Sequence, residues 1–247
     1  MRETHLYTLS LLLSSPVATA DSAVTLILYI KESLVTTLLR IDASARFERS
    51  LTRMLGDLFI ERWQELEPGV ALITRDVGRH PPAIITAAWI AAAFTPMPQR
   101  SAEDTAVLAD SERLIHELEQ ADVLVIATPM YNYGMPAALK AWLDQVIRLD
   151  RTFSFDLARG DRPLAPMLDG KQLVLLTASG EFGFGAGEPN EGADHLLPHL
   201  RSVAKYLGAD NLCHVGIEYQ EFGDQRFEDS RAHAIEDVKA LAARMAG

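Results

Sequence analysis

The sequence is short of cysteine, of basic residues and of long apolar runs. A single cysteine, Cys213, stands in 247 residues, which excludes an intrachain disulfide and a metal site built from several cysteines. Lys and Arg number 23 against 34 Asp and Glu, and the formal net charge of −11 argues against binding of nucleic acid, whose phosphates require a basic surface. No apolar run is long enough to cross a membrane. We therefore expect neither a nucleic-acid nor a membrane partner, and a buried, inert thiol at Cys213.

Several nucleotide, hydrolase and metal signatures are also missing. No Walker lysine is present, and the glycines of 183–187 lack the spacing of a dinucleotide fingerprint, so we expect a flexible loop there. Ser179 lacks the flanking glycines of a nucleophile elbow. His195 and His199 are four residues apart, but Pro198 lies between them and no carboxylate motif accompanies them, so we expect no metal site.

The first 33 residues show no clear periodicity and stand apart from the rest. Arg2, the apolar stretch 6–13 and the small residues 18–20 imitate a secretory signal. Glu3 offsets Arg2, and hydroxyl residues dilute the apolar stretch. We favour an uncleaved N-terminal extension over residues 1–33, in a cytoplasmic protein.

From residue 34 onward, short apolar strands alternate with amphipathic helices. We expect strands at 34–42, 70–77, 121–128, 171–178 and 211–219, a short strand at 152–155, and helices at 50–67, 89–94, 101–120, 136–149, 195–207 and 228–245. The stretch 122–127 is apolar and partly β-branched, which is typical of a strand buried on both faces. The alternation predicts one α/β domain, 34–247, with a doubly wound, five-stranded parallel sheet and helices on both faces.

The loop after the first expected strand has the composition of a phosphate site. Ser44, Ser50 and Thr52 lie just before or at the start of a helix, where free backbone N–H groups and hydroxyls together suit an anion. The alternative is that Ser50 only caps the helix.

Two further loops should meet the first at the carboxyl edge of the sheet, where parallel α/β sheets bind ligands. The loop 130–134 (Met-Tyr-Asn-Tyr-Gly) offers apolar faces and an amide that both donates and accepts hydrogen bonds. The loop 178–181 follows the fourth strand. An aromatic loop by itself is more often a packing element or a protein contact, but a phosphate site beside two ring-facing loops suits flavin mononucleotide, FMN.

Three stretches of the chain resemble one known family. Residues 129–153 (PMYNYGMPAALKAWLDQVIRLDRTF) resemble the flavin loop and following helix of FMN-dependent NADH:quinone oxidoreductases, the azoreductase family. Residues 39–63 are similar to its first strand, phosphate loop and helix, and residues 196–219 to its late helix and last strand. The resemblance, from about residue 34 to the end, implies a flavodoxin-like fold, a homodimer, and tightly held FMN. It also implies that hydride from NADH or NADPH reduces quinones or azo compounds by two electrons.

The resemblance also assigns residues to the site. The FMN phosphate would be held by Ser44, Ser50, Leu51 and Thr52. The ring would be held by Met130, Tyr131, Asn132 and Tyr133 and by a second turn of Ala178, Ser179, Gly180 and Glu181. Phe153 and Phe155 would line the acceptor pocket, by their position after the flavin helix, and no catalytic acid or base is expected. Where the family commonly has a basic or small residue and paired glycines, this chain has Gly180-Glu181-Phe182. A carboxylate near the flavin would disfavour an anionic reduced flavin, so we expect Glu181 to affect the flavin potential and the substrate preference.

Two other functions stay open from the sequence. One is a flavodoxin-like electron carrier that passes single electrons to a protein partner. The other is a flavin-free binding or regulatory protein, because a fold does not fix a function.

Overall fold

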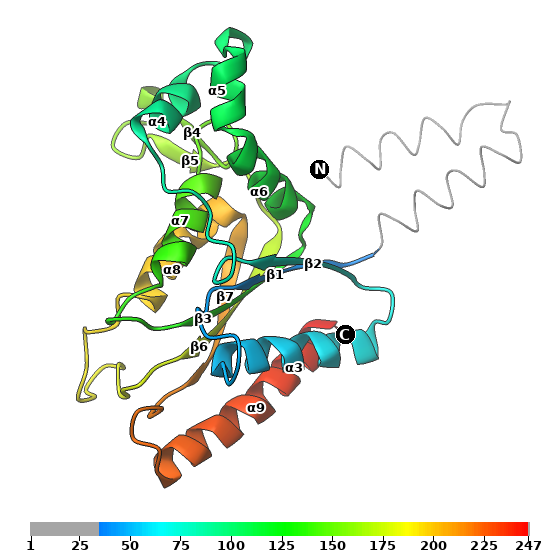
Figure 1. Ribbon diagram of the computed structural model, residues 1–247, viewed down its shortest axis with the longest axis vertical. Helices are drawn as coiled ribbons and strands as arrows, with labels where there is room; N and C mark the ends of the chain where they lie inside the picture. The colour runs from blue at the N-terminus through cyan, green and yellow to red at the C-terminus, as the bar shows by residue number, and fades with distance from the viewer. Residues whose placement is uncertain (1–34, 247) are drawn as a thin grey trace, which may run out of the picture. The chain divides into compact units, whose positions relative to one another are not determined.

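The computed structural model describes residues 35–246, in which strands and helices alternate along the chain (Figure 1). The main sheet contains β1 (Thr37–Asp42), β2 (Ala71–Asp76), β3 (Val123–Pro129), β6 (Lys171–Ala178) and β7 (Ala209–Ile217). All neighbouring strands pair in parallel in the order β2-β1-β3-β6-β7. This is the flavodoxin-like order, so the expected fold class is confirmed. The expectations for residues 1–33 lie outside the described residues, and the domain boundary at residue 34 stays a prediction.

The helices follow the expected order, except that one expected helix is broken in two and another ends in a 3-10 turn. They are α3 (Leu51–Leu66), α4 (Ala87–Phe94), α5 (Ala102–Val107), α6 (Ala109–Gln120), α7 (Ala137–Val146), α8 (Leu197–Val203) and α9 (Gln225–Ala246), with short 3-10 turns η1 (Met97–Gln99), η2 (Leu157–Arg159) and η3 (Ala204–Leu207). The expected helix 101–120 is broken at Leu108, whose side chain is buried against Trp89 and Ala92 of α4. The expected helix 195–207 tightens into η3 and ends at Gly208, which has a φ of 83° that favours glycine.

The short strand expected at 152–155 forms one half of a separate hairpin. β4 (Phe153–Phe155) pairs antiparallel with β5 (Leu164–Pro166), and this hairpin is not part of the main sheet. None of the described helices is long and apolar enough to cross a bilayer.

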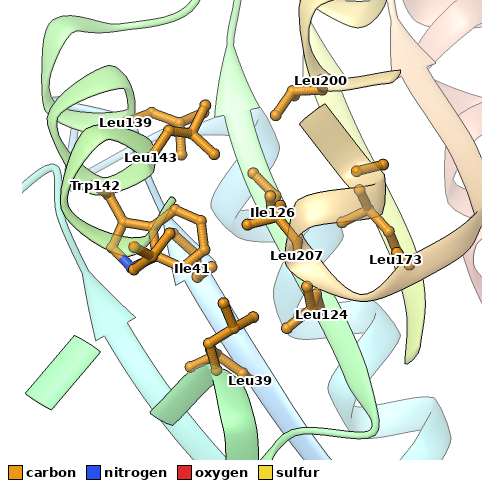
Figure 2. Packing of buried hydrophobic residues seen from close by; sticks show 14 of the residues in the cluster. Leu39, Ile41, Leu124, Ile126, Leu139, Trp142, Leu143, Leu173, Leu200 and Leu207 are labelled. Carbon is orange, nitrogen blue, oxygen red and sulfur yellow. The ribbon is translucent and has the colours of Figure 1, made fainter. Parts of the chain in front are cut away.

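The sheet is buried on both faces because successive strand side chains point to opposite sides. Leu39, Leu124 and Leu173 pack, with neighbours on their strands, under α6, α7, α8 and η3 (Figure 2). The alternate residues Val125 and Val174 pack under α3 and α9, which cover the other face (Figure 1). Every residue of β3 except the last is buried, which confirms the expectation of a strand covered on both faces.

Cys213 is half-buried, so the expectation of a buried thiol is wrong. It lies on β7, an edge strand of the sheet, and packs at the margin of the core under α3 and α9. An edge strand has a neighbour on one side only, and residues near its free side keep part of their exposure.

The central position of β3 gives the first prediction. Leu124→Ala should lower the free energy of unfolding by about 2–5 kcal/mol, because it removes buried methyl groups and leaves a cavity. Leu72→Ala, on the edge strand β2 where the leucine is 38% exposed, should cost less than about 1 kcal/mol. Urea unfolding measures both, and an equal loss for the two variants would contradict this account of the core.

Candidate functional site

Three loops leave the sheet at its carboxyl edge. β1, β3 and β6 are adjacent and parallel, and their register pairs Asp42 with Ala127 and Pro129 with Ala178. The chain returns from β1 through α3 on one face and from β3 through α7 on the other face. The two connections therefore diverge between β1 and β3, which is where open α/β sheets form their ligand crevice.

The first loop, 43–50, ends in free N–H groups at the start of α3. The Ser50 hydroxyl accepts a hydrogen bond from the Arg53 N–H at 3.4 Å and lies 3.3 Å from the Thr52 hydroxyl. Ser50 is thus the helix cap, and its hydroxyl stays beside the helix start. Among the described residues, the N–H groups of Leu51 and Thr52 have no acceptor. Such groups, together with the positive end of the helix dipole, suit an anion.

Ser44 lies at the root of the same loop. Its side chain is buried, and its hydroxyl accepts a hydrogen bond from the Arg46 N–H at 3.2 Å. The structure therefore brings Ser44, Ser50, Leu51 and Thr52 to one loop and helix start, as the sequence assignment requires of a common phosphate site.

Arg53 was not among the expected site residues, yet it joins this loop to the end of β2. Its guanidinium donates to both carboxylate oxygens of Asp76 at 2.8 Å, to the Ser44 carbonyl at 2.8 Å and to the Arg46 carbonyl at 3.1 Å. Burial alone would raise the pKa of Asp76, but hydrogen bonds from Arg53 and from the Arg79 N–H outweigh it and lower that pKa.

A second carboxylate lies beneath the loop. Asp42, the last residue of β1, is 3% exposed. Its Oδ2 lies 2.9 Å from Arg40 Nε and 3.8 Å from Arg53 Nη1. Burial raises the pKa of Asp42 although both arginines oppose the shift. In the sequence, an aspartate ends each of the strands β1 and β2, which could have indicated this pair of carboxylates. Only the register Asp42↔Asp76 shows that the two are neighbours.

The second loop is a tight two-residue turn. Asn132 and Tyr133 have φ values of 48° and 64°, and Tyr131 and Gly134 exchange backbone hydrogen bonds of 2.9 and 3.0 Å. Positive φ at both central residues is the geometry of a type I′ turn, in which asparagine is favoured. The turn leaves Tyr131 and Tyr133 39% and 42% exposed.

The second and third loops are joined to each other. Met130 donates its backbone N–H to the Ala178 carbonyl at 2.8 Å, and the Tyr133 hydroxyl donates to Glu181 Oε1 at 3.0 Å. This hydrogen bond and the charge of Glu181 raise the pKa of Tyr133. The Ser179 hydroxyl donates to the Glu181 carbonyl at 2.9 Å, which closes the third loop on itself.

The third loop packs closely against a side chain that follows β7. A Cβ on Gly180 would lie 2.5 Å from Glu221 Cγ, so a larger residue there would require the Glu221 side chain to move. The eight residues assigned to the ring are thus brought together in two connected loops: Met130, Tyr131, Asn132, Tyr133, Ala178, Ser179, Gly180 and Glu181.

Phe153 and Phe155 are not brought to these loops within one copy of the chain. α7 starts at the carboxyl edge of the sheet, and its ten residues carry the chain about 15 Å away before β4 begins. The Phe153 ring packs 5.8 Å from the ring of Tyr206 in η3, which precedes β7 and so lies at the amino edge. Their acceptor role stays a prediction that requires more than one chain.

The sheet order and the crevice between β1 and β3 define the class first: this is a flavodoxin-like α/β protein. A family described as flavodoxin-like fold matches residues 36–242. An FMN-dependent NADH:quinone oxidoreductase 2 from Idiomarina loihiensis is 48% identical over 218 residues, which cover 85% of this chain and 91% of that protein. An FMN-dependent NAD(P)H:quinone oxidoreductase 1 from Pseudomonas aeruginosa is 42% identical over 206 residues, covering 83% and 97%. The chain belongs to the family of FMN-dependent NADH:quinone oxidoreductases.

Solved structures agree on the fold. A crystal structure of an azoreductase from Bacillus anthracis superposes with a TM-score of 0.76 at 20% identity and covers 85% of this chain and 100% of that one. An FMN-dependent NADH-azoreductase from the same species, solved in complex with FMN, has a TM-score of 0.75 at 17% identity and covers 86% and 100%. At these identities the likeness establishes the architecture alone.

The left-handed turn gives the second prediction. Asn132→Val should lower the free energy of unfolding by about 1–2 kcal/mol relative to Asn132→Gly, because a β-branched residue is strained at a φ of 48° and glycine is not. Denaturant unfolding of the two variants without added ligand measures the difference. Equal stabilities would show that the turn adopts another conformation in solution.

Proposed function

We propose that this protein is an FMN-dependent NAD(P)H oxidoreductase that reduces quinones or azo compounds by two electrons. The observation that carries the proposal is the convergence, at the carboxyl edge of β1, β3 and β6, of three features: a helix start whose first N–H groups have no acceptor among the described residues, the aromatic loop 130–134, and the loop 178–181 that is hydrogen-bonded to it. The family membership, at 48% identity to a quinone oxidoreductase, supports the same activity.

The donor set fits a single phosphate. The N–H groups of Leu51 and Thr52 and the hydroxyls of Ser44 and Ser50 all belong to one loop and helix start, and each can donate to a phosphate oxygen. A diphosphate would need a second set of donors of this kind, whereas this loop supplies a single set. FMN is therefore favoured over FAD.

The loops 130–134 and 178–181 supply the polar and apolar groups that a flavin ring requires of a protein. Asn132 has an amide that both donates and accepts, which suits the polar pyrimidine edge, while Met130 and Tyr131 offer apolar surface. Glu181 is already hydrogen-bonded to Tyr133, so its carboxylate is held near the second loop. Bound FMN supplies the acceptance of hydride from NADH or NADPH and its delivery to the acceptor, and the protein binds, orients and shields.

An electron carrier is the competing function on this fold. The relatives that share about half of the residues are named as oxidoreductases of quinones, which favours the enzyme. Steady turnover of a quinone with NADH by the purified protein alone supports the enzyme, whereas a requirement for a second protein supports the carrier.

We also propose a homodimer with the acceptor pocket at the boundary between copies. Trp89 of α4 is buried and donates to Gln145 of α7 at 2.9 Å, but Phe94 and Met97 nearby are 67% and 64% exposed. Phe155 on the hairpin that follows α7 is 52% exposed. Clustered exposed apolar side chains mark interaction surfaces, and a second copy would bring this end of one chain to the loops of the other.

The flavin pose gives the third prediction. Asn132→Gly keeps the backbone of the turn but removes the amide, so the affinity for FMN should fall roughly tenfold or more. Tyr133→Phe, which removes the hydroxyl that bonds Glu181, should reduce it less. Titration of FMN into the apoproteins measures both affinities, and flavin released by heating should be FMN. Unchanged affinity in Asn132→Gly, or released FAD, would contradict the assignment.

The proposed dimer gives the fourth prediction. Phe94→Glu should shift the protein from dimer to monomer in sedimentation velocity and lower quinone turnover at least tenfold, because a charge on an apolar interface is costly. Leu66→Glu, at an exposed leucine at the end of α3, is the matched control and should leave the assembly unchanged. A fully active monomeric parent would overturn the proposal.

A further inference from the structure

The guanidinium of Arg53 stands beside the proposed phosphate site but has little left to offer a phosphate. Its Nε donates to the Arg46 carbonyl, its Nη1 to Asp76, and its Nη2 to both Asp76 and the Ser44 carbonyl. These bonds use four of the five N–H groups that arginine has. Its charge is matched by both oxygens of Asp76 at 2.8 Å, in the bidentate geometry of a strong pair.

The same contacts hold the backbone of the phosphate loop. Ser44 and Arg46 belong to the first half of that loop, and Arg53 donates to the carbonyl of each. Asp76 in turn binds Arg53 to the end of β2. Among the described residues, the guanidinium bonds these two loop carbonyls and none of the hydroxyls assigned to the phosphate. The side chains of Arg53 and Asp76 are only 14% and 20% exposed, so solvent competes weakly for these bonds.

Gly78 provides an independent sign that β2 shapes this loop. A Cβ at Gly78 would lie 2.2 Å from the Ser44 carbonyl oxygen and 3.1 Å from Arg53 Nη2. The Gly78 N–H also donates to the Asp42 carbonyl at 3.0 Å. The backbone after β2 therefore packs directly against the Ser44 carbonyl that Arg53 binds, and there is no room between them for a methyl group.

We propose that Arg53 is a positioning residue for FMN: it sets the shape of the phosphate loop through the Ser44 and Arg46 carbonyls and does not itself bind the phosphate. The proposal rests on the proposed function, since it concerns the same cofactor. Asp76 and Gly78 belong to the same support, which joins the end of β2 to the loop after β1.

Riboflavin separates this role from a general effect on folding, because it has the ring of FMN and lacks the phosphate. The experiment titrates FMN and riboflavin into apoprotein prepared from the full chain, and compares the ratio of the two affinities. Arg53→Gln should weaken FMN binding roughly tenfold or more and riboflavin binding less than about twofold. Gly78→Ala should lower the same ratio without removing any charge, and it keeps the test valid if Arg53→Gln folds poorly. Arg62→Gln, which removes an arginine of an exposed ion pair on the same helix, should leave the ratio unchanged.

Asp76→Asn distinguishes positioning from direct contact. If Arg53 positions the loop, loss of its anchor should weaken FMN binding. Tighter FMN binding in Asp76→Asn would show that a released Arg53 binds phosphate, and would overturn the inference. An unchanged FMN-to-riboflavin ratio in both Arg53→Gln and Gly78→Ala, in a parent that prefers FMN, would overturn the inference alone. A parent that binds both flavins equally would overturn it together with the phosphate site of the proposed function.

Discussion

The burial of β3 on both faces is the constraint on which the site depends. Its residues from Val123 to Thr128 are all buried between two helical layers, so the strand cannot slide or tilt without opening the core. Its neighbours β1 and β6 are held to it by parallel register, and all three strands end at one edge. The loops can then carry exposed, polar and strained residues, because the core and not the loops supplies the stability.

The loops themselves are held by hydrogen bonds at a few points. Asn132 and Tyr133 occupy left-handed backbone, and that turn is fixed to the third loop through Met130 and Glu181. The first loop has no such partner among the other two loops. It is held by Arg53, whose bonds run to two loop carbonyls and to Asp76. The site is thus two connected ring-side loops and one separately supported phosphate loop.

The charge distribution around the first loop explains how an acidic protein can offer an anion site. The formal net charge is −11, yet the two aspartates at the ends of β1 and β2, Asp42 and Asp76, are each paired with arginine. The helix start then presents N–H donors with no acceptor among the described residues. Local pairing, and not the net charge, decides what binds there, because screening limits distant surface charges to a range of about 8–10 Å at physiological ionic strength.

The sequence by itself determined the fold class and the loops that carry the site. Apolar strands that alternate with amphipathic helices predict an α/β protein with a parallel sheet. The stretch 129–153 located the aromatic loop by local pattern alone. Only the tertiary structure decided how the loops are supported. The partners of the Arg53 guanidinium are 7 to 23 residues away along the chain. Tyr133 and its partner Glu181 are 48 residues apart. Likewise, the position of Phe153 after the flavin helix suggested nearness to the flavin, whereas the length of α7 places it at the other edge. Local pattern records which residues form an element, but contacts between distant elements depend on strand order and register, which a single sequence does not encode in any local signal.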